Sequence, residues 1–492
     1  MILAIDQGTT GTTVLLVDES GRVVDRSYRE LTQHYPRPGW VEHDAEEIWT
    51  GVVDATGELL ERSGASPTVV GITNQRETFV VWDRANLHPV ARAIVWQCRR
   101  SADICTEMKD AGREALFRER TGLLLDPYFS GTKLRWLLDS DAKLRRRAEA
   151  GELAFGTVDT WLVTRLTAGR EHVTEPGNAS RTLLFDIKRL AWDSELCGAL
   201  DVPMGLLPEV RDSSGDFGRT DPGAFLGLDL PIGGVAGDQQ AALFGQACFE
   251  PGMCKNTYGT GSFVLLNTGP KPRLSRAGML ATVGWQLAGT ATYAMEGAIF
   301  ITGAALQWLR DGLGIIHSAA EAGPIASTVT DTDGVYLVPA FVGLGAPHWD
   351  PGARGLISGL TRGTTGDHLV RAAVESMAFQ TADVLEAMAS EGVRPQELRV
   401  DGGASVMDAL LQFQADLLGI PVLRSATAET TALGASFLAG LATGTWASLD
   451  EVAATWTEER RFTPAMAAED REVRMAGWRG AVRRALTTVD RS

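Results

Sequence analysis

Cysteine and histidine are scarce in this 492-residue sequence. The five cysteines form no Cys-x-x-Cys pair, and the seven histidines form no His-Glu-x-x-His motif. We therefore expect neither a disulfide framework nor a zinc site of the usual ligand spacing. Scattered cysteines of odd number are typical of reduced thiols, so the sequence predicts a cytoplasmic protein.

Long apolar runs and an excess of positive charge are also missing. No stretch approaches the roughly 18 consecutive apolar residues of a membrane span, and the first residues, MILAIDQGTT, have no basic segment typical of a signal peptide. The net charge of −16 argues against nucleic acid or an anionic membrane as the main partner. We expect small-molecule partners, with any phosphate held locally by backbone amides, a metal ion or a few cations.

Two common nucleotide-binding motifs are absent as well. The sequence contains no GxxxxGK[ST], which excludes a P-loop, and no GxGxxG, which excludes the usual dinucleotide fingerprint. The sequence does contain 54 glycines. Its 492 residues are more than a single hydrophobic core usually supports, so two or three domains are expected. Strands at Ile2–Ile5 and Thr12–Asp18, a helix from Asp44 and further strands at Val69–Thr73 predict an α/β sheet.

Three small, glycine-containing turns follow predicted strands, at Asp6–Gly11, Gly259–Gly261 and Asp401–Gly403. Glycine lets backbone amides approach an anion closely, so these turns are candidates for phosphate binding. Gly259–Gly261 taken alone favours an ordinary hairpin turn. Because the strand–turn–strand pattern occurs in both halves, we predict two similarly built domains with a boundary near residue 247.

Two aspartates stand at the ends of predicted strands. Asp238 lies between an apolar run and a helix-forming segment, where free amides and the helix dipole favour the ionised carboxylate. It is a candidate general base, although the stretch taken alone favours a helix N-cap. Asp6 precedes the first glycine turn and is a candidate Mg²⁺ ligand; by itself it fits an Asx-turn.

A charged pair, Arg76 and Glu77, stands between two predicted strands. Arg donates and Glu accepts, so together they can bind adjacent hydroxyls of a polyol, whereas spacing alone favours a surface ion pair. Trp96, Tyr128 and Phe263 are expected to be core aromatics unless other residues give them a role.

Ten motifs spread over nearly the whole chain resemble the glycerol kinases of the FGGY carbohydrate kinase family, within the actin/hexokinase ATPase superfamily. They include DQGTT (6–10), PRPGWVEHD (36–44), GITNQRET (71–78), GDQQAALFGQ (237–246), KNTYGTGSF (255–263) and VDGGA (400–404). The resemblance implies an α/β fold of two actin-like (ribonuclease H-like) domains, each a mixed β-sheet flanked by helices, with the active site in the interdomain cleft. Residues 1–247 would carry the glycerol site and the first phosphate motif, and residues 248–492 the second phosphate and adenosine motifs.

The implied activity is ATP-dependent phosphorylation of glycerol to sn-glycerol 3-phosphate, with Asp238 as general base. ATP or ADP and Mg²⁺ are the implied cofactors, and a homo-oligomer, dimer or tetramer, is expected by family analogy. Substrate-binding positions by the resemblance are Arg76, Glu77, Trp96, Tyr128, Asp238, Gln239 and Phe263. Nucleotide positions are Thr9, Thr10, Gly11, Thr13, Thr260, Gly303, Gln307, Gly403 and Met407, and the metal positions are Asp6 and Asp238.

Three positions depart from the family pattern. Thr13 stands where an arginine is common near the phosphates, and Met407 where an asparagine usually approaches the adenine. Asp229, in the segment Phe225–Leu230, replaces an arginine of the loop that binds fructose 1,6-bisphosphate in some members, so we expect that inhibition to be absent.

Two alternative functions remain at this point. One is an FGGY kinase for another polyol or a ketose, such as erythritol or xylulose. The other is a filament-forming ATPase of the actin-like superfamily, which would have no need of the polar set formed by Arg76, Glu77 and Asp238.

Overall fold

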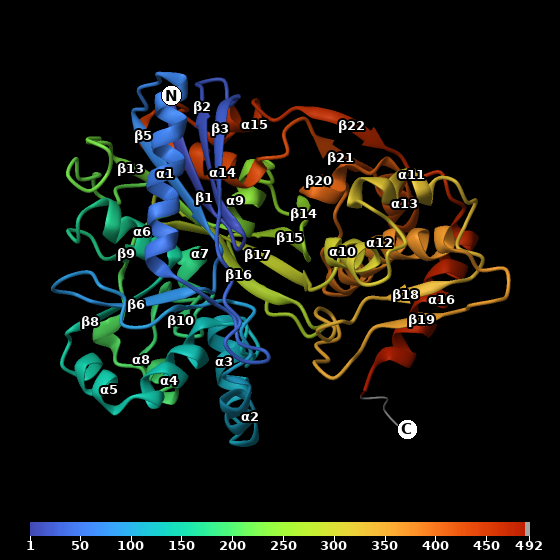
Figure 1. The fold of residues 1–492 in the computed structure, drawn as a ribbon, viewed down its shortest axis with the longest axis horizontal. Coiled ribbons are helices and arrows are strands. Elements are labelled where there is room, and N and C mark those ends of the chain that lie inside the picture. The colour runs from blue at the N-terminus through green and yellow to red at the C-terminus, as the bar shows by residue number, and fades with distance from the viewer. Residues whose placement is uncertain (488–492) are drawn as a thin grey trace.

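The computed structural model describes residues 1–487 and consists of two lobes, each built on a mixed β-sheet with helices on its faces (Figure 1). The predicted two-domain α/β class is confirmed. Residues 488–492, the end of the predicted second domain, lie outside the described part. Among residues 1–487, no helix has both the length and the apolar character needed to cross a membrane.

The sheet of the first lobe has the strand order β3-β2-β1-β5-β13. Strands β1, β5 and β13 are parallel, and β2 and β3 run antiparallel to their neighbours. The bounds are β1 Ile2–Gln7, β2 Gly11–Val17, β3 Val23–Glu30, β5 Val69–Asn74 and β13 Ile232–Gly237. Helices α1 (Ala45–Ser63) and α6 (Val158–Leu166) share one core cluster with this sheet. As predicted, α1 begins after Asp44, whose side chain accepts hydrogen bonds from the first-turn amides.

The sheet of the second lobe has the order β16-β17-β15-β14-β20-β21-β22. Its five inner strands repeat the directions of the first sheet: β14, β20 and β21 are parallel, and β15 and β17 are antiparallel. The bounds are β14 Cys254–Tyr258, β15 Ser262–Gly269, β16 Leu280–Leu287, β17 Thr290–Ile299, β20 Leu398–Asp401, β21 Val422–Ser425 and β22 Glu458–Phe462. The expectation of two similarly built halves is thereby confirmed, while the exact boundary at residue 247 stays a prediction.

Helices α10, α12 and α13 share a core cluster with the second sheet (Figure 1). The helices of the second half of the sequence include α10 Gly303–Asp311, α11 Ala322–Ala326, α12 Gly366–Ser390, α13 Asp408–Leu418, α15 Leu449–Ala453 and α16 Ala468–Ala485. Short strands β18 (Tyr336–Val338) and β19 (Leu356–Ser358) form a separate ribbon. The predicted end of α13 at Gly419 is observed, with that glycine at φ 67°.

Below the first sheet, a four-stranded sheet β4-β7-β6-β8 supports a further group of helices (Figure 1). These strands are β4 Glu42–His43, β6 Phe79–Asp83, β7 Ala93–Ile94 and β8 Leu153–Thr157. The helices are α2 Ala102–Asp110, α3 Glu114–Thr121, α4 Ser130–Ser140, α5 Ala142–Glu149, α7 Pro176–Ala179 and α8 Ser194–Ala199; the remaining strands are β9 Val173–Thr174, β10 Phe185–Asp186, β11 Ala191–Trp192 and β12 Glu209–Val210.

Two helices, α9 (Asp238–Gly245) and α14 (Thr430–Thr443), join the lobes. Although α14 belongs to the second half of the sequence, it packs on β1, β5 and β13 of the first sheet and against α9. Glycines allow the close crossing: a Cβ at Gly434 would lie 1.8 Å from the carbonyl oxygen of Ala241, and one at Gly245 would lie 1.9 Å from that of Thr430. The lobes are therefore connected through a backbone-to-backbone contact.

Substitution at this crossing should lower stability. We expect Gly434→Ala to reduce the free energy of unfolding by at least about 1–3 kcal/mol, because two backbones must separate to admit the methyl group. Gly57→Ala in α1 is the matched control: its Cβ would meet Leu226 at an ordinary 3.7 Å, and the better helix former should be neutral or stabilising. Urea unfolding of both variants measures the difference, and equal stabilities would show that the helices separate without cost.

Candidate active site

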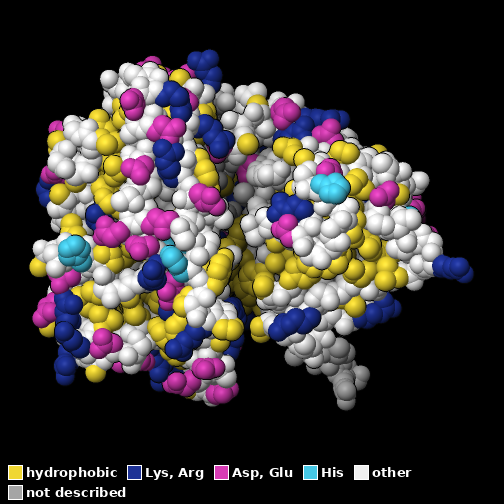
Figure 2. Space-filling view, in the orientation of Figure 1, with side chains coloured by type: hydrophobic (Ala, Val, Ile, Leu, Met, Phe, Trp, Pro, Cys, Tyr) yellow, Lys and Arg dark blue, Asp and Glu magenta, His cyan; other side chains and the backbone are white. Residues whose placement is uncertain are grey.

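The predicted polar residues gather where the parallel strands of both sheets end. In the first lobe, Asp6 lies at the end of β1, Arg76 follows β5, and Asp238 follows β13. In the second lobe, the turn after β14 and the glycines after β20 occupy the corresponding edge. In open sheets of this kind, ligands bind beyond the carboxyl ends of parallel strands. Figure 2 shows the hollow between the lobes, with hydrophobic side chains on its walls.

Two neighbouring cavities occupy this region. A cavity of about 360 Å³, the smaller cavity, is lined by residues of both lobes. A cavity of about 600 Å³, the larger cavity, is lined by second-lobe residues from β14, α10, α11 and the segment after β20. Gly259, Thr260 and Gln307 line both cavities, so a ligand in one would lie next to a ligand in the other.

All seven predicted substrate-binding residues line the smaller cavity: Arg76, Glu77, Trp96, Tyr128, Asp238, Gln239 and Phe263. Its apolar wall is aromatic, because the ring of Trp96 stands edge-on to Tyr128 and Phe263 at centroid distances of 5.7 and 6.1 Å. The wall is tied to the first glycine turn, since Trp96 Nε1 donates to Thr9 Oγ1 at 2.8 Å. Sequence position alone predicted that Trp96, Tyr128 and Phe263 are ordinary core residues. It did not reveal that all three line the same cavity.

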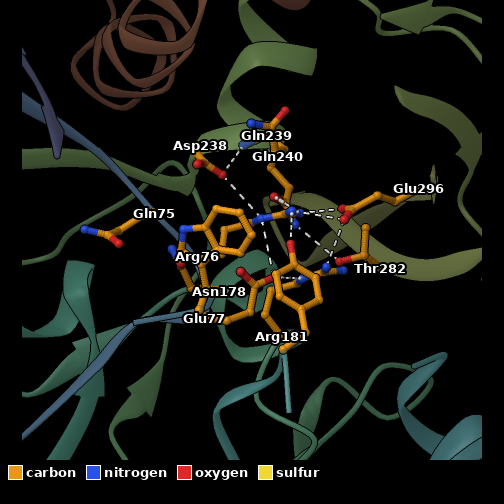
Figure 3. Close-up of polar contacts among 12 residues, drawn as sticks. Gln75, Arg76, Glu77, Asn178, Arg181, Asp238, Gln239, Gln240, Thr282 and Glu296 are labelled. Atoms are coloured by element: carbon orange, nitrogen blue, oxygen red, sulfur yellow. Dashed lines mark hydrogen bonds and ion pairs between the residues drawn. The ribbon is translucent and has the colours of Figure 1, made fainter. Parts of the chain in front are cut away.

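Arg76 is the centre of a buried polar network (Figure 3). It forms a two-pronged ion pair with Glu296, donates from Nη2 to Tyr128 Oη at 3.1 Å, and donates from Nη1 to Gln240 Oε1 at 3.3 Å. Its Nε lies 3.3 Å from Asp238 Oδ1. The pair with Glu77 is not the surface ion pair that spacing favours, because both side chains are buried. Every nitrogen of Arg76 is engaged, so the guanidinium orients the acceptors around it.

Asp238 is not an N-cap, contrary to what its local sequence favours. Gly237 occupies the N-cap position of α9, and Asp238 is the first helical residue. Its Oδ1 accepts from the amide of Gln239 at 2.7 Å, while no donor among residues 1–487 reaches Oδ2. The side chain keeps 27% of its surface exposed, toward the cavity.

Burial raises the pKa of Asp238 to about 6, although the Arg76 guanidinium lowers it. The sequence suggested that the helix N-terminus would keep the pKa of this carboxyl low, whereas the structure shows a raised pKa. The carboxylate is still mainly ionised at neutral pH. A partly ionised carboxyl with a free oxygen in a cavity is suited to accept a proton.

Asp6 lies close to the same carboxylate. Burial, together with the negative charges of Asp238 and Glu429, raises the pKa of Asp6 to about 8. The negative charges around Asp6 mark a place where a cation is favourable, and carboxylate oxygens suit Mg²⁺. In the described part of the chain, no group of three or more His, Cys, Asp or Glu is arranged to hold a metal. A bound Mg²⁺ would therefore keep several waters or phosphate oxygens as ligands.

Five of the nine predicted nucleotide positions line the larger cavity: Thr260, Gly303, Gln307, Gly403 and Met407. Gly303 permits the start of α10 to pack on the 259–261 turn, because a Cβ there would lie 2.6 Å from the carbonyl oxygen of Gly259. Gly403 has a different role: no atom lies within 4 Å of its built Cβ, so a side chain would project into the cavity.

The other four predicted nucleotide positions lie in the first turn and β2. Thr9 and Thr10 line the smaller cavity. Gly11 is needed for packing, since a Cβ would lie 2.4 Å from both Tyr28 Oη and the carbonyl oxygen of Arg29. Thr13 pairs with Asp6 across β1 and β2. Neither Gly11 nor Thr13 is among the residues that line the two cavities, so their assignment as nucleotide contacts stays a prediction.

Three buried charged residues of the site escaped sequence reasoning. Arg181 donates to Glu77 at 2.7 Å and to Glu296 at 2.9 Å. Lys255 donates to Gln239, which lines the smaller cavity. The available signal was a single charged residue in a strand with no other charge, as for Glu296 in β17 and Lys255 in β14, because a buried charge must be paired.

Asp229 forms a surface ion pair with Arg219 at 2.7 Å. The segment that carries it packs over α1, where the ring of Phe225 lies 6.2 Å from that of Trp49. The expected absence of inhibition by fructose 1,6-bisphosphate stays a prediction.

Comparison with known proteins shows which family this chain belongs to. Residues 1–245 match the N-terminal domain of the FGGY family of carbohydrate kinases, and residues 254–443 match its C-terminal domain. The glycerol kinase of Carboxydothermus hydrogenoformans is 56% identical over 488 residues, covering 98% of each chain. Glycerol kinase 2 of Thermotoga maritima is 54% identical, covering 99% of this chain and 98% of the relative.

Solved structures agree. The crystal structure of Plasmodium falciparum glycerol kinase with ADP matches with a TM-score of 0.92 at 35% identity, covering 99% of this chain and 98% of that one. A xylulose kinase from Lactobacillus acidophilus, at 20% identity and a TM-score of 0.86, shares the fold. With two family models that together span most of its length and full-length relatives above half identity, the chain belongs to the FGGY family of carbohydrate kinases.

Proposed function

We propose that this chain transfers the terminal phosphoryl group of ATP to a terminal hydroxyl of glycerol, giving sn-glycerol 3-phosphate and ADP. The observation that carries the proposal is the smaller cavity, in which Arg76, Glu77, Tyr128, Asp238 and Gln239 converge beside an aromatic wall. The names of the relatives at 54–56% identity over nearly the full chain support the same substrate.

The polar groups of the smaller cavity suit a short triol. Glu77 and Asp238 offer carboxylate oxygens as acceptors, while Tyr128 Oη, which accepts from Arg76, keeps its own proton for donation. Trp96 and Phe263 face the carbon chain from the apolar side. Because Arg76 and Arg181 hold the acceptors in place, the cavity is organised before the substrate arrives.

The nucleotide is assigned to the larger cavity, which meets the smaller one at Gly259 and Thr260. This arrangement directs the terminal phosphate toward the substrate hydroxyl near Asp238. The ADP of the Plasmodium relative supports a nucleotide here. The amides of Thr9, Thr10, Thr260 and Gly261 are the candidate donors for phosphate oxygens, because within residues 1–487 they donate to no other group. The amides of Gly8 and Gly259 and the first amides of α10 already donate to carbonyl oxygens of the turns.

Mg²⁺ would be held near Asp6 and Asp238, because the negative charge of Asp238 raises the pKa of Asp6 and a shared cation would relieve this repulsion. When bound, Mg²⁺ would neutralise charge on the phosphate oxygens during transfer. Asp238 Oδ2 accepts the proton of the attacking hydroxyl, while Oδ1 is held by the Gln239 amide and Arg76. Positioning and charge stabilisation supply most of the rate enhancement in reactions of this class.

The decisive experiment measures ADP formation on adding glycerol, against the same ATP and Mg²⁺ mixture without it. A panel of polyols and ketoses tests the first alternative, and we expect glycerol to have the highest kcat/KM. Preferential use of erythritol or xylulose would overturn the substrate assignment. Failure with every compound, together with ATP-dependent assembly, would favour the filament-forming alternative.

Three further assignments belong to this proposal. The division into domains 1–247 and 248–492 is supported by family models that match 1–245 and 254–443. A cytoplasmic location is supported by five free cysteines, all buried. A dimer or tetramer rests on family analogy and is checked by light scattering.

A large side chain at Gly403 should block the nucleotide. We expect Gly403→Leu to raise the KM for ATP at least about tenfold, since the side chain enters space assigned to the ligand, while the KM for glycerol and the unfolding midpoint change little. The matched control is Gly198→Leu in α8, an exposed glycine whose Cβ also has no neighbour within 4 Å. Steady-state kinetics with varied ATP measure the effect; an unchanged KM would move the nucleotide away from Gly403.

A further inference from the structure

Lys255 is a fully buried lysine in β14 that the proposed phosphoryl transfer does not use. Its Nζ donates to Gln239 Oε1 and, at 2.9 Å, to Thr257 Oγ1. Both acceptors line the smaller cavity, whereas Lys255 itself is not among the lining residues. Burying an ammonium group costs free energy unless the group is paired. The two hydrogen bonds and the charged groups around Lys255 compensate for its burial.

Charged side chains from four other parts of the fold face this ammonium. The carboxylates of Asp401 on β20, Asp238 on α9 and Glu296 on β17 attract it, and the Arg76 guanidinium repels it. The net environment is negative, which holds the ammonium behind Gln239. Lys255 thus lies behind the substrate cavity, one contact away from the ligand.

The contact fixes the orientation of the Gln239 amide. A lysine ammonium has three donors and no acceptor, so the Gln239 atom that it touches must be the carbonyl oxygen. Gln239 Nε2 then points the other way, and within residues 1–487 it donates to no protein group. Because Gln239 lines the smaller cavity, its two N–H groups are available to a ligand. A flipped amide would instead present an acceptor beside the Asp238 carboxylate.

We infer that Lys255 is a positioning residue that locks Gln239 as a hydrogen-bond donor, and that this donor selects a substrate carrying a second hydroxyl beside the reacting one. The inference rests on the proposed function and deepens it. It assigns substrate discrimination to the pair Lys255–Gln239, while Asp238 accepts the proton.

The inference predicts a specific loss of discrimination. Wild-type enzyme should prefer glycerol over propane-1,2-diol and propane-1,3-diol, each of which lacks one hydroxyl. In Lys255→Met, the ratio of kcat/KM for glycerol to that for propane-1,3-diol, which lacks the hydroxyl beside the reacting one, should fall roughly tenfold to a hundredfold, because a binding donor is no longer held in place. The loss should appear mainly in the glycerol KM, with the ATP KM unchanged. Since both substrates need the same base, altered ionisation of Asp238 cancels in this ratio.

A double-mutant cycle with Gln239→Leu tests the pairing. Gln239→Leu should lower the same ratio, and adding Lys255→Met to it should change the ratio little further. The matched control is Lys133→Met, which removes another fully buried lysine whose Nζ donates only to the backbone carbonyls of Val95 and Tyr128. This control should lower stability while leaving the diol ratios unchanged.

Circular dichroism establishes that each variant is folded. If Lys255→Met does not fold, Gln239→Leu alone decides: unchanged diol ratios in that variant overturn the inference. Independent, multiplicative effects of the two substitutions, or an equal change in Lys133→Met, overturn it as well. If wild-type enzyme does not phosphorylate glycerol at all, the proposed function fails instead, so the two failures are distinguishable.

Discussion

Replacing Asp238 with asparagine should lower turnover with glycerol by about 10²–10⁴-fold, which is the usual effect of removing a positioned general base. The carboxylate is the only group at the start of α9 with an oxygen, Oδ2, that is free of donors within residues 1–487 and exposed to the smaller cavity. Asparagine has nearly the same shape and can still accept from the Gln239 amide through its oxygen. Folding should therefore be intact, as measured by thermal unfolding.

The pH dependence of turnover supplies the matching observation. Because the reaction needs the ionised carboxylate and its pKa is raised to about 6, turnover should be nearly constant above that pH. Below it, turnover should fall about tenfold for each unit of pH. Asp238→Asn should lose this acidic limb. Near-native turnover in the variant, or the same limb in both proteins, would show that Asp238 is not the base.

Much of the fold was predictable from local patterns. The strand–turn–strand units at Asp6–Gly11 and Gly259–Gly261 indicated duplicated sheets, since such turns are specified by residues close together in sequence. The cap at Asp44 and the glycine end of α13 were predictable for the same reason. The packing of α14 on the first sheet was not, because it depends on close backbone contact between residues as distant as Gly71 and Ala435.

The site, like the fold, has residues that local sequence predicts and residues that it does not. Asp238 and the Arg76–Glu77 pair stand in recognisable motifs, but their partners do not. Glu296 is 220 residues from Arg76, and Arg181 is 104 residues from Glu77. Nothing local predicts which buried charges will meet; only the requirement that each be paired marks them as candidates. The N-cap interpretation of Asp238 failed because local sequence does not reveal whether Gly237 or Asp238 ends the extended backbone.

Removing the centre of the network should be nearly as damaging as removing the base. In Arg76→Ala, Glu77 and Glu296 would keep the Arg181 guanidinium, whereas Asp238 would lose the one ion pair that it forms within residues 1–487. Leaving buried carboxylates uncompensated should lower the free energy of unfolding by about 3–5 kcal/mol. The kcat/KM for glycerol should fall about 10²-fold or more, since Tyr128 and Asp238 lose the donor that orients them. The KM for glycerol should rise strongly and that for ATP little.

Arg181→Ala separates the two roles of the network, stability and substrate binding. It removes a guanidinium from the same pair of glutamates, yet Arg181 does not line the smaller cavity and makes no contact with Asp238. We expect a similar loss of stability in urea unfolding but a smaller change in the glycerol KM than in Arg76→Ala. If Arg76→Ala raises both KM values equally, Arg76 holds the lobes together and has no particular role in the substrate cavity. If the two variants have the same kinetics, the network acts only as a structural unit, and substrate binding depends on Glu77, Tyr128 and Gln239 alone.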